Sequence, residues 1–142
     1  MSVTRRDAMR VGAGALAGFA IPARAQHGQS EITPEQAIAA FVGDTPVSDG
    51  GVTLTLPDLA EDGYRVAVEI DAPGAAEVAL IAPGNPVPQV LAVTFGPMAV
   101  VQRVSTRMRL GQTQEVLALA RMPDGSVRRA TRQVDVVVGG CA

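Results

Sequence analysis

The chain has 142 residues, enough for one small domain; 47% of them are apolar but only 3% are aromatic. It has no tryptophan, so its core must be built from Val, Leu, Ile and Ala, and a stacking platform for bases or sugars is not expected. The net charge is −2, with twelve arginines and no lysine, which argues against a nucleic-acid-binding protein because such proteins concentrate basic residues on one face.

Residues 1–25 are predicted to be an export signal. Arg5 and Arg6 precede a mildly apolar stretch that is too short to span a membrane, and small residues up to Ala25 place a cleavage site before Gln26. The paired arginines resemble a twin-arginine (Tat) signal, with the Sec route as the alternative. We therefore expect a periplasmic protein with no membrane insertion after cleavage. Removal of this segment, which holds four of the arginines and one acidic residue, leaves a net charge of −5.

Residues 26–51 are predicted to form a polar linker and one short helix. Thr33 can cap the helix, Pro34 fits its first position, and Gln36 completes a capping box. Apolar residues recur at helical spacing up to a stop at Gly43, namely Ala37, Ile38, Phe41 and Val42. A loop is expected after the helix because turn-forming residues gather there: Pro46, Asp49, Gly50 and Gly51.

At residue 52 the spacing of apolar residues changes from helical to alternating, and alternation continues to residue 138. Val52, Leu54 and Leu56 are typical of a half-buried strand. The runs predicted as strands are 52–56, 64–70, 77–82, 90–95, 100–110, 114–121 and 127–138. Seven short strands without a second helix indicate an all-β fold, an immunoglobulin-like antiparallel β-sandwich, with a closed barrel as the alternative. Residues 123–126, Pro-Asp-Gly-Ser, predict a tight hairpin.

No catalytic or cofactor signature is visible. The only histidine, His27, lies in the linker, which excludes a Ser-His-Asp or Cys-His arrangement on the folded scaffold and makes a zinc site improbable. We therefore predict no metal and no cofactor.

The run 100–110 is predicted to carry a basic face. Arg103, Arg107 and Arg109 alternate with residues expected to point inward, Val104, Thr106, Met108 and Leu110. A solvated outer face explains the pattern; the functional alternative is a patch that docks an acidic partner or steers small anions.

The sequence ends in "VDVVVGGCA", which contains the only cysteine, Cys141. Gly139 and Gly140 carry no Cβ, so we expect residues 139–142 to be a flexible arm beyond the last strand. No cation neighbours Cys141, and a carboxylate follows one residue later, so the thiol is favoured over the thiolate. This argues against a self-sufficient thiol enzyme. A passive carrier thiol, an incidental cysteine and a disulfide to a second subunit all remain open.

The segment from Thr33 to Ala142 resembles the SoxY family, the substrate-carrying subunits of the periplasmic Sox system that oxidises thiosulfate. The resemblance rests on "LPDLAEDGYRVAVEIDAP", "APGNPVPQVLAVTFGPMA", "VSTRMRLGQTQEVLALARMPDGSVRRA" and the terminal "VVVGGCA". It implies an immunoglobulin-like sandwich, with Cys141 matching the carrier cysteine and Gly139 and Gly140 its two leading glycines. Ala142 stands where the family has the first of two trailing glycines.

The resemblance further implies a non-enzymatic protein that holds sulfur intermediates covalently on Cys141. Its partners would be a small β-sandwich subunit of the SoxZ type, in a heterodimer, and three Sox enzymes that dock transiently: a haem-containing SoxAX type, a SoxB-type hydrolase and a SoxCD-type dehydrogenase. The alternative is a non-catalytic interaction module, or a divergent paralogue whose Cys141 forms an intermolecular disulfide.

Overall fold

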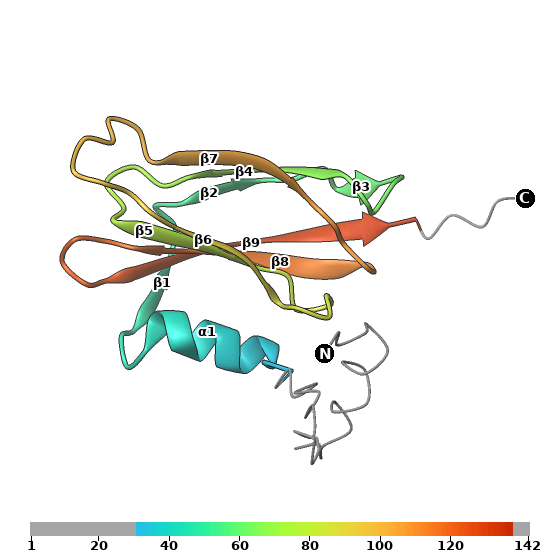
Figure 1. Cartoon of the computed structure of the whole chain (residues 1–142), viewed down its shortest axis with the longest axis horizontal. Coiled ribbons are helices and arrows are strands. Elements are labelled where there is room, and N and C mark those ends of the chain that lie inside the picture. The colour runs from blue at the N-terminus through green and yellow to red at the C-terminus, as the bar shows by residue number, and fades with distance from the viewer. Residues whose placement is uncertain (1–30, 138–142) are drawn as a thin grey trace, which may run out of the picture.

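The computed structural model describes residues 31–137, which form two β-sheets packed face to face with one helix against the outside of the larger sheet (Figure 1). Its elements are α1 (Pro34–Val42), β1 (Val47–Asp49), β2 (Thr53–Thr55), β3 (Leu59–Ala60), β4 (Val66–Asp71), β5 (Glu77–Ile81), β6 (Gln89–Thr94), β7 (Arg103–Met108), β8 (Gln114–Arg121) and β9 (Val127–Val136). The predicted signal segment and the predicted C-terminal arm lie outside the described residues. The only helix within 31–137 is too short to cross a membrane.

The larger sheet has the strand order β1-β9-β8-β5-β6, with β3 added beside the end of β9, and the smaller sheet has the order β2-β4-β7. Apolar side chains that alternate along the strands fill the space between the sheets, among them Leu54, Val68, Leu80, Val116 and Val134, each at most 5% exposed. This arrangement confirms the predicted all-β sandwich. Two pairings depart from the antiparallel expectation, because β1 and β3 both run parallel to β9.

Helix α1 begins and ends as the sequence predicts. Thr33 accepts a hydrogen bond from the backbone of Gln36, the Gln36 side chain accepts one from the backbone of Thr33, and the helix ends before Gly43, whose φ is 60°. Its apolar face packs on the outer face of the larger sheet, where Phe41 contacts a cluster formed by Ala79, Ile81, Leu119 and Val127. Central strands β5 and β8 are therefore covered on both faces, which explains why they are nearly continuous apolar runs.

The seven predicted strands correspond to β2 and β4–β9, and the hairpin is confirmed. In that hairpin the backbone N–H of Gly125, with φ 87°, donates to the carbonyl of Met122. The structure adds two strands that were not predicted, β1 and β3. Each has only two or three residues and pairs with β9 alone, so no local alternation marks it.

Candidate functional site: the end of the last strand

Strand β9 is held on both sides up to the last described residue. On one side the backbone N–H of Asp135 donates to the carbonyl of Asp58, and that of Val137 to the carbonyl of Ala60, both at 2.9 Å. On the other side the backbone N–H of Val136 donates to Oγ1 of Thr113 at 2.9 Å. The chain therefore leaves the sandwich at a fixed point, beside β3. In Figure 1 this end of β9 and the loop that joins β6 to β7 lie at opposite ends of the sandwich.

A pocket of about 350 Å³ opens beside this exit point. Three segments that are far apart in the sequence line it: the turn after β3, the turn after β7 and the end of β9. The lining residues are Glu61, Asp62, Gly63, Tyr64, Arg109, Leu110, Gly111, Val136 and Val137. Val136 and Val137, which directly precede the segment that carries Cys141, therefore form part of the pocket wall.

Gly63 sets how closely the three segments approach. The backbone N–H of Leu110 donates to the carbonyl of Gly63 at 2.8 Å. A Cβ at position 63 would lie 2.5 Å from the carbonyl oxygen of Leu110 and 2.9 Å from Cγ1 of Val136, closer than real Cβ atoms come. Only glycine therefore fits between β9 and the turn after β7 in this arrangement.

Tyr64 and Arg109 form the polar rim of the pocket. The Arg109 guanidinium lies over the Tyr64 ring, 4.7 Å from its centroid, in a cation–π contact. The backbone N–H of Tyr64 donates to Oδ1 of Asp62 at 2.9 Å, which fixes the turn that presents the ring. Tyr64 remains 69% exposed, so one large amphipathic side chain stands on the surface next to the end of β9.

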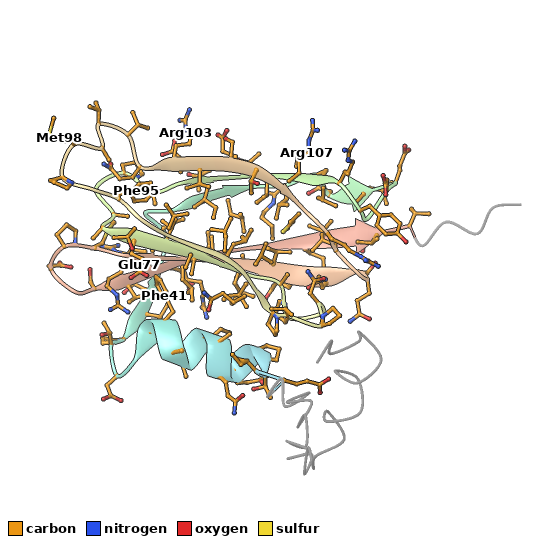
Figure 2. All side chains as sticks on the ribbon, in the orientation of Figure 1. Phe41, Glu77, Phe95, Met98, Arg103 and Arg107 are labelled. Carbon is orange, nitrogen blue, oxygen red and sulfur yellow. The ribbon has the colours of Figure 1, made fainter. Side chains whose placement is uncertain are left out.

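The three arginines of the predicted basic face share an exposed surface but do not form one patch. Arg103 donates to Oδ2 of Asp71 on β4, and Glu69 lies nearby, so acidic neighbours offset its charge and raise its pKa. Arg107 and Arg109 have no ion pair to a described residue. Figure 2 shows Arg103 and Arg107 pointing away from the sandwich. The Arg109 guanidinium stacks on the Tyr64 ring at the pocket and does not join the other two arginines.

Thr106 lies opposite the buried Val68 of β4 and so takes the predicted inward side of β7. It is nevertheless exposed, because β7 is the edge strand of the smaller sheet. Glu61 and Asp62 lie in the turn after β3, which lines the pocket. The role of Gly63 and Tyr64 was missed, although the sequence offered one signal: the only tyrosine of the chain directly follows a glycine in "EDGY".

The predicted carrier residues Gly139, Gly140 and Cys141 lie outside the described residues, and the structure does not place them. What it does place is Val137, four residues before the cysteine. Within residues 31–137 no three His, Cys, Asp or Glu side chains are grouped so that they could hold a metal ion.

Comparisons with known proteins address the identity of this fold. Residues 38–141 match the family model described as sulfur oxidation protein SoxY, and the match includes Cys141. The structure resembles the sulfur carrier protein SoxY from Chlorobium limicola f thiosulfatophilum, with a TM-score of 0.65 and 29% sequence identity, over 77% of this chain and 98% of that one. A search of the curated proteins finds no match.

Superoxide reductases (neelaredoxins) from Ignicoccus hospitalis share the fold at much lower identity. One structure of this reductase has a TM-score of 0.56 at 11% identity, over 64% of this chain and 94% of that one. Another has a TM-score of 0.55 at 13% identity, over 76% of this chain and 91% of that one. These two likenesses concern the sandwich alone. Because the family model covers most of the chain, including the only cysteine, the chain belongs to the SoxY family.

Proposed function

We propose that this protein is a carrier of sulfur intermediates, which it holds covalently on Cys141 and presents to partner enzymes. The observation that carries the proposal is the family match, which runs through Cys141, the only thiol of the chain. The Chlorobium relative, a sulfur carrier protein, supports the same role. The protein itself would catalyse nothing.

The anchoring of β9 supports the carrier role mechanically. Hydrogen bonds hold the backbone up to Val137, and Cys141 follows four residues later, so its sulfur can reach about 14 Å from the sandwich. A partner active site that accepts the cysteine must therefore contact the surface around the end of β9. That surface presents Tyr64 and Arg109, an aromatic ring and a cation of the kind that anchors protein contacts.

The proposed chemistry begins with the oxidative joining of thiosulfate to Cys141. The Sγ–H bond breaks, a bond forms between Sγ and the outer sulfur of thiosulfate, the proton passes to solvent, and two electrons pass to a haem-containing partner. Water then attacks the terminal sulfonate in a hydrolase, which releases sulfate and leaves a persulfide on Cys141. A dehydrogenase would oxidise that remaining sulfur. A SoxZ-type subunit would accompany the protein, and both would act in the periplasm after export.

The test is intact-protein mass spectrometry on residues 26–142, incubated with thiosulfate and the haem-containing partner. We expect the mass to rise by one thiosulfate unit, with the added mass lost on reduction, and no change in a Cys141→Ser control. An unmodified thiol, or a disulfide-linked dimer as the sole product, would contradict the carrier role and favour the interaction module.

A second measurement tests the surface around the arm. Tyr64→Ala should raise the KM of the loading enzyme for this protein and leave kcat unchanged, because the ring would help to bind the partner and takes no part in the bond that forms at Cys141. Thr53→Ala, an exposed change on the far edge strand β2, serves as the control. Equal KM values for the two variants would remove Tyr64 from the docking surface.

A further inference from the structure

The turn between β7 and β8, residues 109–113, supplies two contacts at the end of β9. The Arg109 guanidinium stacks on the Tyr64 ring, 4.7 Å from its centroid. Oγ1 of Thr113 accepts the backbone N–H of Val136 at 2.9 Å. The position of this turn therefore affects both the surface beside the arm and the strand from which the arm begins.

Asn85, in the loop that joins β5 to β6, holds this turn with its side chain. Its Nδ2 donates to the carbonyl of Arg109 at 2.7 Å, and its Oδ1 accepts the backbone N–H of Gly111 at 3.0 Å. These are the two bonds that a residue of a parallel neighbouring strand would make to the residues on either side of Leu110. Since β7 ends at Met108, the Asn85 side chain extends the hydrogen bonding beyond the strand and into the turn.

A second amide, that of Gln114, fixes the orientation of the Asn85 side chain. Gln114 is 8% exposed and begins β8; its Nε2 donates to Oδ1 of Asn85 and to the carbonyl of Gln112, both at 3.2 Å. Its Oε1 accepts the backbone N–H of Gly84 at 2.7 Å. Oδ1 of Asn85 therefore faces two N–H donors, from Gln114 and Gly111, while Nδ2 faces a carbonyl, so the carboxamide has one favourable orientation.

The geometry points to Asn85 as a positioning residue for the docking of partner enzymes. It is not among the residues that line the pocket, and it acts through the turn rather than on Cys141. By fixing the backbone of residues 109–111, it keeps the Arg109 guanidinium over Tyr64, so that the ring and the cation are presented in one arrangement. Groups that are held in place before binding lose less conformational entropy when the partner arrives. The inference rests on the proposed carrier function and adds to it a residue that the partner need not contact.

The two bonds of Asn85 require an amide at this position. One atom must donate to a carbonyl while the other accepts an N–H. Aspartate has the same shape but, when ionised, it only accepts; in Asn85→Asp one carboxylate oxygen would therefore lie against the carbonyl oxygen of Arg109 and repel it. Asn85→Ala removes both bonds without adding a charge, and it carries the test if the carboxylate prevents folding.

Gln102 offers a matched control at the other end of the sandwich. This half-buried amide, in the loop that joins β6 to β7, accepts the backbone N–H of Gly74 at 3.0 Å and donates to the carbonyl of Ala99 at 2.8 Å. Gln102→Glu therefore removes the same kind of donor from the same kind of contact. Figure 1 shows this loop at the end of the sandwich remote from the end of β9. A loss of stability would affect both variants, whereas a loss of docking would affect Asn85→Asp alone.

The test measures the loading of Cys141 in residues 26–142 by the haem-containing partner, over a range of concentrations of this protein. We expect Asn85→Asp and Asn85→Ala to raise KM about fivefold or more, as the loss of one anchor side chain at an interface does, and to leave kcat unchanged. Gln102→Glu should keep the KM of the unaltered protein. In an Arg109→Ala background, Asn85→Asp should raise KM no further, because the side chain through which it acts has been removed.

Tyr64 supplies a readout that needs no partner. It is the only tyrosine of a chain that has no tryptophan, so the tyrosine band of the near-ultraviolet circular dichroism spectrum reports on this ring alone. We expect the band to weaken in Asn85→Asp and to stay unchanged in Gln102→Glu. Thermal unfolding of both variants checks that the fold is retained.

The outcomes separate this proposal from the carrier function. Equal KM values for Asn85→Asp and Gln102→Glu would overturn the positioning role, and so would an effect of Asn85→Asp that persists in full in the Arg109→Ala background. An unchanged Tyr64 band in Asn85→Asp would overturn it as well, because the turn would then not depend on the amide. If the unaltered protein is not loaded at all, the carrier function fails and this proposal fails with it.

Discussion

Gly63→Ala tests whether the close contact at the end of β9 is a structural requirement. The added Cβ would lie 2.5 Å from the carbonyl oxygen of Leu110 and 2.9 Å from Cγ1 of Val136. The carbonyl belongs to the backbone and cannot rotate away, and the same turn donates the Leu110 N–H to Gly63, so β9 or the turn must move. Overpacking of this kind costs about 1–3 kcal/mol. For a domain of this size, 2 kcal/mol corresponds to a fall in Tm of roughly 8 °C.

Urea unfolding and calorimetry of Gly63→Ala would measure this loss against a matched control, Gly96→Ala. A Cβ at position 96 meets no atom within 4 Å, and Gly96 is not among the glycines with positive φ. That control should therefore be neutral, or more stable by about 0.4–1 kcal/mol because alanine restricts the unfolded chain. If the two variants unfold within about 0.5 kcal/mol of each other, which is the usual range for surface substitutions, the contact between Gly63, Leu110 and Val136 does not constrain the end of β9.

Three further predictions concern the sandwich. Leu80→Ala, at a fully buried position between the sheets, should lower the free energy of unfolding by about 2–5 kcal/mol in urea titrations. Gln114→Ala should cost about 1–3 kcal/mol, because the buried amide accepts the N–H of Gly84 at 2.7 Å and that donor would lose its partner; a smaller loss would mean that water replaces it. Arg129 donates to Asp49 and holds the pKa of that carboxyl below its usual value. The wild-type protein should therefore exceed Asp49→Asn in stability above about pH 4, with the difference vanishing as the pH falls further; a difference that persists at low pH would contradict this.

The strands that could be predicted are those whose side chains alternate locally. Strand β4 is marked by Val66, Val68 and Ile70, all buried. Strand β1 has no such mark, because its three residues are all exposed and it exists only through pairing with β9, 80 residues away along the chain. Turn-forming residues on both sides of β1 favoured a loop, and nothing local could reveal a parallel partner so distant.

The candidate site shows the same division between local and long-range information. The alternation of side chains along β7 predicts that Arg103 is exposed, but it does not predict the acidic neighbour that offsets its charge. This contact requires Asp71 to lie opposite Arg103 across β4 and β7, and this register is set by packing of the whole sheet. The pocket at the end of β9 joins turns from three parts of the chain, so its existence could not be read from any one of them.

Strand β9 also has a consequence for the time at which the domain can fold. It lies between β8 and β1 in the larger sheet and also pairs with β3, so three strands depend on a segment synthesised after all of them. Contacts between residues so far apart in the chain form slowly, because the entropy of closing the intervening loop is lost before any pairing compensates for it. The larger sheet cannot be completed until residue 136 has left the ribosome. We therefore expect the amides of β1 and β3 to become protected from hydrogen exchange at the same time as those of β9, in one late step of folding.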